Sequence, residues 1–166
     1  MLVVAPDPST KDDTPDVDER TASDEGLVSS RPPAEYVTLR RWTLSTALEI
    51  KDVRRELRGV IGGEGPPSRG ALADVPERMI LVASELAANA VEHGRPPTIV
   101  TLGSAGQRYL LEVADHDPDS TPVLAGRRAP GAGGFGLQIA RRLGQEVGWY
   151  ATATTKHIWV TFASAA

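Results

Sequence analysis

Residues 84–94 read SELAANAVEHG and form the second half of a segment that predicts one long helix. The helix is expected to begin after Asp74 and to end at His93, before Gly94. Its core-facing positions recur at helical spacing and are Val75, Met79, Val82, Leu86 and Ala90. Glu85 and Asn89 share one face beside that stripe, and asparagine is a residue that helix interiors disfavour. The pair therefore indicates a functional site on this helix, although a surface Glu and Asn alone would be a weak signal.

The flanking segments predict a sheet that supports this helix. Alternation of apolar and polar residues predicts strands over 36–42, 98–102 and 108–115, and a final antiparallel pair over 146–152 and 156–162. A capping box over Thr46 to Glu49 predicts the start of a helix, whose apolar positions are Ile50, Val53, Leu57, Val60 and Ile61. A further, short helix is predicted over 135–143, between the strands over 108–115 and 146–152. This order predicts an α+β fold, a two-layer sandwich with the helices on one face of a largely antiparallel mixed sheet.

The bulk composition limits the possible classes of protein. The 166 residues have room for one domain and a tail, and the absence of cysteine excludes disulfides and thiolate chemistry. No apolar run is long enough to span a bilayer and no signal sequence is recognisable, so we expect a cytoplasmic protein without a membrane partner.

Charge divides the chain into two parts. Residues 1–34 carry eight acidic residues against Lys11, Arg20 and Arg31, and this composition predicts a disordered acidic tail. The domain over 35–166 is nearly neutral, which argues against direct nucleic-acid binding. A basic stripe on the first helix is either a solvated face or a partner surface, and consists of Lys51, Arg54, Arg55 and Arg58.

Asp115 ends a predicted strand on the same side as the apolar residues Tyr109, Leu111 and Val113. A partly buried carboxylate needs hydrogen-bond donors, and the exocyclic amino group of adenine is one. Guanine presents an oxygen acceptor at the equivalent place, so Asp115 is predicted to select ATP over GTP. The alternative is an aspartate that only starts a turn before Pro118.

Residues 131–136 read GAGGFG directly before a predicted helix, where glycine backbone can approach a phosphate closely. The spacing is G-x-G-x-x-G, but the preceding strand ends sixteen residues before Gly131, so the context of a dinucleotide fold is missing. No Walker lysine follows either. A flexible loop is the alternative interpretation.

The residues of the long helix suggest specific chemistry. The neutral amide oxygen of Asn89 suits Mg²⁺, which completes its coordination with phosphate oxygens and water. Glu85, one turn away, is placed to accept a proton from an attacking hydroxyl or water. His93 continues the face, although the helix dipole and a C-terminal cap also explain it.

Together and in this order, the motifs resemble those of the GHKL ATPase superfamily, which has the Bergerat fold. SELAANAVEHG resembles its N box, VADHDP at 113–118 its first glycine-box region, and GGFGLQIARRL at 133–143 its second. The resemblance covers about residues 35–163 and implies ATP and Mg²⁺ as cofactors, with Glu85 as base and Asn89 as metal ligand. The implied nucleotide site comprises Asn89, His93, Asp115, Asp117, Gly131, Gly133, Gly134, Phe135, Gly136 and Leu137.

Within the superfamily the compact size and the motif spacing are most similar to those of the anti-sigma-factor serine kinases. A sensor histidine kinase is disfavoured, because no dimerisation helices precede the ATP domain in this sequence. The resemblance implies a serine/threonine protein kinase that phosphorylates an anti-anti-sigma protein and binds a sigma factor; a homodimer is one assembly it allows. The alternative is a catalytically weak ATP-binding module that acts by sequestering a protein partner.

Two positions depart from the family pattern. Asp117 stands where relatives usually carry glycine or serine and adds negative charge near the triphosphate, unless Arg127 and Arg128 compensate. His157 stands near the place of a pocket threonine in relatives. Both positions raise the question of how well the site holds ATP.

Overall fold

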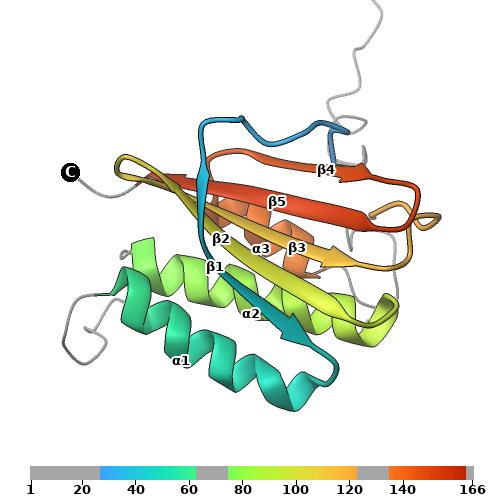
Figure 1. Cartoon of the computed structure of the whole chain (residues 1–166). Coiled ribbons are helices and arrows are strands. Elements are labelled where there is room, and N and C mark those ends of the chain that lie inside the picture. Colours follow the sequence, from blue (N-terminus) through green and yellow to red (C-terminus); the bar gives the residue numbers. More distant parts are fainter. Residues whose placement is uncertain (1–26, 63–74, 123–134, 164–166) are drawn as a thin grey trace, which may run out of the picture.

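The computed structural model describes residues 27–62, 75–122 and 135–163, and these contain five strands, three α-helices and a short 3₁₀ helix (Figure 1). In chain order the elements are β1 (Val37–Leu44), the 3₁₀ helix η1 (Ala47–Glu49), α1 (Ile50–Ile61), α2 (Val75–His93), β2 (Thr98–Ala105), β3 (Arg108–Asp115), α3 (Phe135–Leu143), β4 (Val147–Ala151) and β5 (Lys156–Ala163). This order confirms the predicted one.

The strands form one sheet in the order β1-β2-β3-β5-β4, with every neighbouring pair antiparallel. The helices cover one face of the sheet, and α2 lies between α1 and α3 (Figure 1). The predicted two-layer α+β fold is confirmed. The sheet was predicted to be mixed, but the parallel pairing is slight. In the described residues it consists of one isolated bridge, between Ser29 and Trp149. No helix in these described segments is long and apolar enough to cross a membrane.

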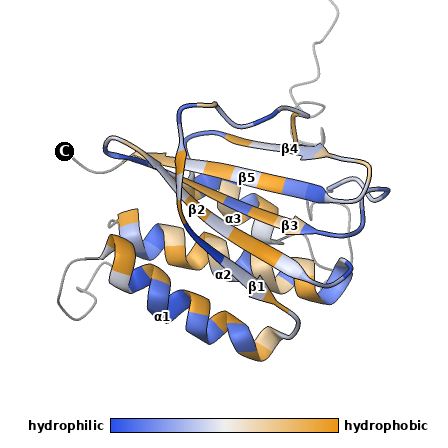
Figure 2. Cartoon of the chain, in the orientation of Figure 1, coloured by the Kyte–Doolittle hydropathy of each residue, from blue (hydrophilic) through white to orange (hydrophobic). Residues whose placement is uncertain are grey.

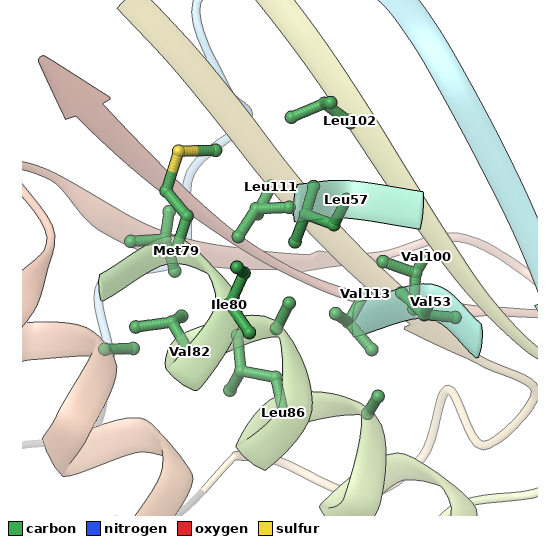
Figure 3. Packing of buried hydrophobic residues seen from close by; sticks show 14 of the residues in the cluster. Val53, Leu57, Met79, Ile80, Val82, Leu86, Val100, Leu102, Leu111 and Val113 are labelled. Carbon is green, nitrogen blue, oxygen red and sulfur yellow. The ribbon is translucent and has the colours of Figure 1, made fainter. Parts of the chain in front are cut away.

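The core lies between the helices and the sheet, and α2 contributes most to it. All five residues of its predicted apolar stripe are buried. Figure 3 shows how side chains of α1, α2, β2 and β3 meet there, among them Leu57, Met79, Leu102 and Leu111, which are almost inaccessible to solvent. Burial of this many aliphatic side chains is the main term that stabilises the fold.

Helix α1 is amphipathic, as Figure 2 shows by its mostly hydrophilic ribbon with hydrophobic residues at intervals. The predicted cap is present, because the backbone N–H groups of Ser45 and Thr46 donate to Oε2 of Glu49 at 2.6 and 2.9 Å. Val60 was predicted to belong to the apolar stripe of this helix, but the residue is 38% exposed, so that assignment is wrong. It adjoins Ile61, which packs on the core, and adjacent helical residues point about 100° apart.

The loop between β2 and β3 is tighter than predicted. The first strand was predicted to end at residue 102, but β2 continues to Ala105 and pairs there with Arg108. Gly106 takes a positive φ of 60°, a conformation that glycine adopts without strain. The hairpin is therefore closed by two residues.

Residues 27–36, here called the N-terminal strap, cross the outer face of the sheet from edge strand β4 to edge strand β1 (Figure 1). Ser30 N donates to Trp149 O at 2.8 Å, and Trp149 N donates to Val28 O at 3.1 Å. The indole of Trp159 donates to Ser30 O at 2.7 Å, and Leu27 is buried. The predicted disordered tail over 1–34 overlaps the strap, and the prediction is wrong where the backbone of Val28 and Ser30 pairs with Trp149 of edge strand β4. Residues 1–26 lie outside the described residues.

The outer face also carries a polar cluster. The rings of Tyr150 and His157 stack at 4.4 Å, and Arg31 of the strap lies 4.5 Å above Tyr150. Oε1 of Glu112 is 3.1 Å from the Tyr150 hydroxyl, which donates to it, and 2.7 Å from His157 Nδ1. Burial, with the Glu112 carboxylate next in importance, raises the pKa of Tyr150 to about 12. The cluster joins the strap to β3, β4 and β5.

The strap is expected to contribute to stability. A chain of residues 35–166 lacks the Trp149 and Trp159 contacts of the strap, whereas a chain of residues 27–166 keeps them. Urea unfolding should show the shorter chain to be less stable by about 1–3 kcal/mol, from lost apolar burial and hydrogen bonds. Equal stability of the two chains would show that the strap does not support the sheet.

Candidate functional site

A cavity of about 300 Å³ opens beside the second half of α2. Its walls come from α2, the end of β3 with the turn that follows, α3 and the start of β5. The residues that line it are Leu86, Asn89, Ala90, His93, Gly94, Val113, Asp115, Ser120, Thr121, Pro122, Leu137, Lys156 and Ile158. The cavity thus gathers several of the predicted site residues from three separate segments of the chain.

Asp115 is the buried polar group of this cavity. It ends β3 on the same side as the buried residues Leu111 and Val113, as the alternation predicted. Its Oδ1 accepts a hydrogen bond from Asp117 N at 2.8 Å, and its Oδ2 lies 3.4 Å from Lys156 Nζ. A carboxylate that is 5% exposed needs such partners, since water cannot solvate it. Asp115 is also one of the residues that line the cavity.

Gly94 keeps the Asp115 carboxylate against the end of α2. A Cβ at position 94 would lie 2.6 Å from Asp115 Oδ2 and 2.6 Å from Ala90 O, closer than real side chains approach. A glycine at this point does more than end the helix. It allows the backbone after α2 to pack directly on the carboxylate of β3.

Gly136 makes an equivalent close approach between α3 and α2. A Cβ there would lie 2.7 Å from Asn89 Nδ2 and 3.1 Å from Glu85 O. The first turn of α3, which begins at Phe135, therefore packs on the face of α2 that carries Glu85 and Asn89. Leu137 follows and lines the cavity. The structure thus brings together the two motifs that the sequence could only order along the chain.

Not every predicted site residue reaches the cavity. Asn89 and His93 line it, whereas Glu85 and Asp117 are half-buried and are not among its lining residues. Asp117 contributes its backbone N–H to Asp115 instead. Gly131, Gly133 and Gly134 lie outside the described residues, as do Arg127 and Arg128.

Lys156 was not predicted as a site residue, and His157 does not lie at the pocket where the sequence placed it. On β5, Lys156 and Ile158 line the cavity, while His157 faces the outer side of the sheet and contacts Glu112 and Tyr150. The Lys156 ammonium donates to Ser120 Oγ at 2.6 Å. The alternation of side chains along a strand could have predicted the position of Lys156. Val160 and Phe162 belong to the core, and Lys156 lies on the same side of β5 as both.

The cavity suits a nucleotide better than a metal held by protein alone. Among the described residues, no three histidine, cysteine, aspartate or glutamate side chains are grouped so that they could hold a metal ion. A single amide, that of Asn89, is enough for Mg²⁺ when phosphate oxygens and water supply the other ligands. The cavity also joins apolar walls from α2 and β5 to a few polar groups, which is typical of small-molecule sites.

The fold and the cavity together define an ATPase-type domain of the α+β class. The family model described as the histidine kinase-like ATPase domain matches residues 33–162, and the chain belongs to this family. The predicted membership of the GHKL superfamily is thereby confirmed.

Known proteins give one further indication. A comparison with curated proteins found no match. Among solved structures, the chain is similar to the RsbU and RsbW domains of Rv1364c from Mycobacterium tuberculosis, with a TM-score of 0.50 and 20% identity. The match covers 75% of this chain and 32% of that one, so the chain spans about a third of its length. At this identity the similarity shows the fold.

Replacement of Gly136 by alanine is expected to disturb the junction of α2 and α3, because the new Cβ would overlap with Asn89 Nδ2 at 2.7 Å and make a tight contact of 3.1 Å with Glu85 O. We expect G136A to lower the unfolding free energy by about 1–3 kcal/mol in spite of alanine's better helix propensity. Gly59 on α1 is the matched control, since nothing lies within 4 Å of its Cβ position. G59A should stabilise the protein by up to about 1 kcal/mol. Similar effects of the two substitutions in urea unfolding would contradict the packing.

Proposed function

We propose that the cavity binds ATP, with Asp115 accepting a hydrogen bond from the adenine amino group. The observation that carries this proposal is a carboxylate that is almost fully buried yet lines a cavity. Such a group selects a ligand that places a hydrogen-bond donor at the right position, because a buried donor or acceptor without a partner costs binding free energy. Val113, Ile158 and Leu86 supply apolar walls for a base.

The phosphates are proposed to extend from this cavity towards Asn89 and the first turn of α3. Free backbone N–H groups and the dipole at a helix N-terminus favour anions. Asn89 would hold Mg²⁺ together with phosphate oxygens, and the bound metal neutralises phosphate charge. Gly133 and Gly134, directly before α3, remain predicted phosphate contacts. Asp117 gives its backbone N–H to Asp115, and its side chain is not among those that line the cavity.

Titration with Mg-ATP tests this site. We expect the wild-type chain to bind, and Asp115→Ala and Asn89→Ala each to weaken binding by roughly ten- to hundredfold through loss of a hydrogen bond or a metal ligand. Glu92→Ala is the control, because Glu92 is exposed on the last turn of α2. Failure of the wild type to bind at millimolar Mg-ATP would refute the proposal.

We further propose that the domain is a serine/threonine protein kinase of the anti-sigma type. The family membership and a neighbouring structure that contains an RsbW domain support a regulatory kinase. Glu85 lies one helical turn from Asn89, beside the start of α3, where a carboxylate can accept the proton of an acceptor hydroxyl. ATP supplies the phosphoryl group.

The proposed partners are an anti-anti-sigma protein that carries the acceptor serine and a sigma factor that the domain binds. The basic stripe of α1 offers a surface for an acidic segment of either protein. Lys51 and Arg54 are exposed, while Arg55 pairs with Asp52 at 2.8 Å and Arg58 pairs with Glu77 at 3.3 Å. At least two of its charges are therefore not engaged in the ion pairs of the described residues.

Transfer from radiolabelled ATP to a candidate anti-anti-sigma protein tests the catalytic role. Glu85→Gln should lower the transfer rate by about 10²–10⁴-fold, because it removes the general base, and should leave ATP affinity nearly unchanged. Glu92→Gln, the same change two turns along the helix, should have little effect. Transfer that is unaffected by Glu85→Gln would exclude this mechanism, and ATP binding without transfer would favour the sequestering module.

A further inference from the structure

We propose that an acidic segment near the N-terminus of the chain binds the basic stripe of α1 and competes there with acidic partner proteins. The segment comprises residues 12–19, which read DDTPDVDE, and is here called the acidic segment. It lies outside the described residues. The binding is independent of the proposed kinase activity, whereas the competition rests on the partner surface proposed for α1.

The basic stripe forms a continuous charged surface on α1. Its four side chains lie on one helical face and line a hollow of about 260 Å³. Lys51 and Arg54 are exposed and belong to no ion pair among the described residues. Leu48, one turn before Lys51, is 77% exposed, so an apolar residue adjoins the charges. A ligand that suits this surface is anionic and carries an apolar side chain.

The acidic segment matches this surface in charge and in composition. Five of its eight residues are aspartate or glutamate, and none is basic. Val17 stands between Asp16 and Asp18 and can supply the apolar contact. Single exposed ion pairs are weak. A tethered segment, however, acts at an effective concentration of about millimolar order, so a dissociation constant of about 1 mM is enough to cover the stripe in roughly half of the molecules.

Leu27, the first described residue, lies at the edge of the sheet opposite to α1. Its backbone oxygen accepts a hydrogen bond from the indole of Trp149 on β4 at 3.0 Å. At the other edge, the indole of Trp42 on β1 donates to Glu56 Oε2 of α1 at 2.8 Å (Figure 1). From β4 to β1 the sheet is about 19 Å wide, at about 4.8 Å per strand. A segment that binds α1 must span at least that distance from Leu27.

Chain length decides which acidic residues can reach the stripe. Asp18 is nine residues from Leu27 and can lie up to about 30 Å from it, at about 3.3 Å per residue. Asp12 is fifteen residues away and can lie up to about 50 Å from it. Asp24 and Glu25 can lie at most about 10 Å from Leu27. The acidic segment therefore reaches α1, whereas Asp24 and Glu25 do not reach it and serve as controls.

Cross-linking of the full chain with a water-soluble carbodiimide tests the docking, because this reagent joins a carboxylate directly to a lysine amine. The chain has three lysines, and Lys51 is the exposed one among the described residues, since the Lys156 side chain is only 12% exposed. We expect mass spectrometry to find an amide between Lys51 and the acidic segment at low salt. Several-fold less of it should form at about 1 M salt, where charges are screened beyond about 3 Å.

Arg54→Glu reverses one charge of the stripe and should lower the yield of this cross-link several-fold. Arg141→Glu is the matched control, because Arg141 is exposed near the end of α3 and the same change of charge there should leave the yield unchanged. A mixture with an isotope-labelled copy of the chain shows whether the link forms within one molecule. The inference would be overturned by equal effects of the two substitutions, by the absence of the Lys51 link, or by links that form only between copies.

Titration of the full chain with a polyglutamate peptide tests the competition. We expect the double variant Asp13→Asn, Asp16→Asn to bind the peptide roughly three- to tenfold more tightly than the wild type, because less of the stripe is covered. The double variant Asp24→Asn, Glu25→Gln removes the same charge and should bind as the wild type does. Equal affinities of the two variants would overturn the proposed competition. Neither experiment uses nucleotide, so failure to bind Mg-ATP would refute the proposed function and leave the docking intact.

Discussion

The packing of α2 against the sheet is the constraint on which the rest of the structure depends. Its buried apolar face is held between α1, α3 and the central strands, so the position of its other residues is set by the core. Two glycines then bring neighbours into direct contact with it: Gly94 admits the Asp115 carboxylate, and Gly136 admits the first turn of α3. A rigid helix with close neighbours on two sides is a suitable support for a ligand site.

Strand β5 separates two charged regions that are adjacent in sequence. Lys156 faces the cavity and pairs with Asp115, whereas His157 faces the outer side and joins Glu112 and Tyr150. The sheet between them is apolar, so each region makes its own hydrogen bonds. His157 therefore belongs to the polar cluster of the outer face, and Lys156 belongs to the cavity.

Much of the fold follows from local patterns that tertiary structure did not override. The sequence periodicity correctly predicted helix α2, and the alternation correctly predicted strand β3, because an element with one buried face repeats apolar residues at its own period. The capping box before α1 was also predicted correctly. The errors have local causes too. Val60 was assigned to a face that Ile61 occupies, and residues 27–34 were predicted to belong to a disordered tail although the backbone of Val28 and Ser30 pairs with Trp149 of β4.

By itself the sequence determined the element order, the α+β class and the family, and it predicted Glu85, Asn89 and Asp115 as site residues, because these depend on spacing along single elements. Only the tertiary structure decided which of them share a cavity, that Lys156 stands beside Asp115, and that Gly94 and Gly136 are needed for close contacts. The physical reason is that the pattern of apolar residues in a sequence indicates which side of a helix or strand is buried. Which distant residues that side contacts is set by the packing of the whole domain.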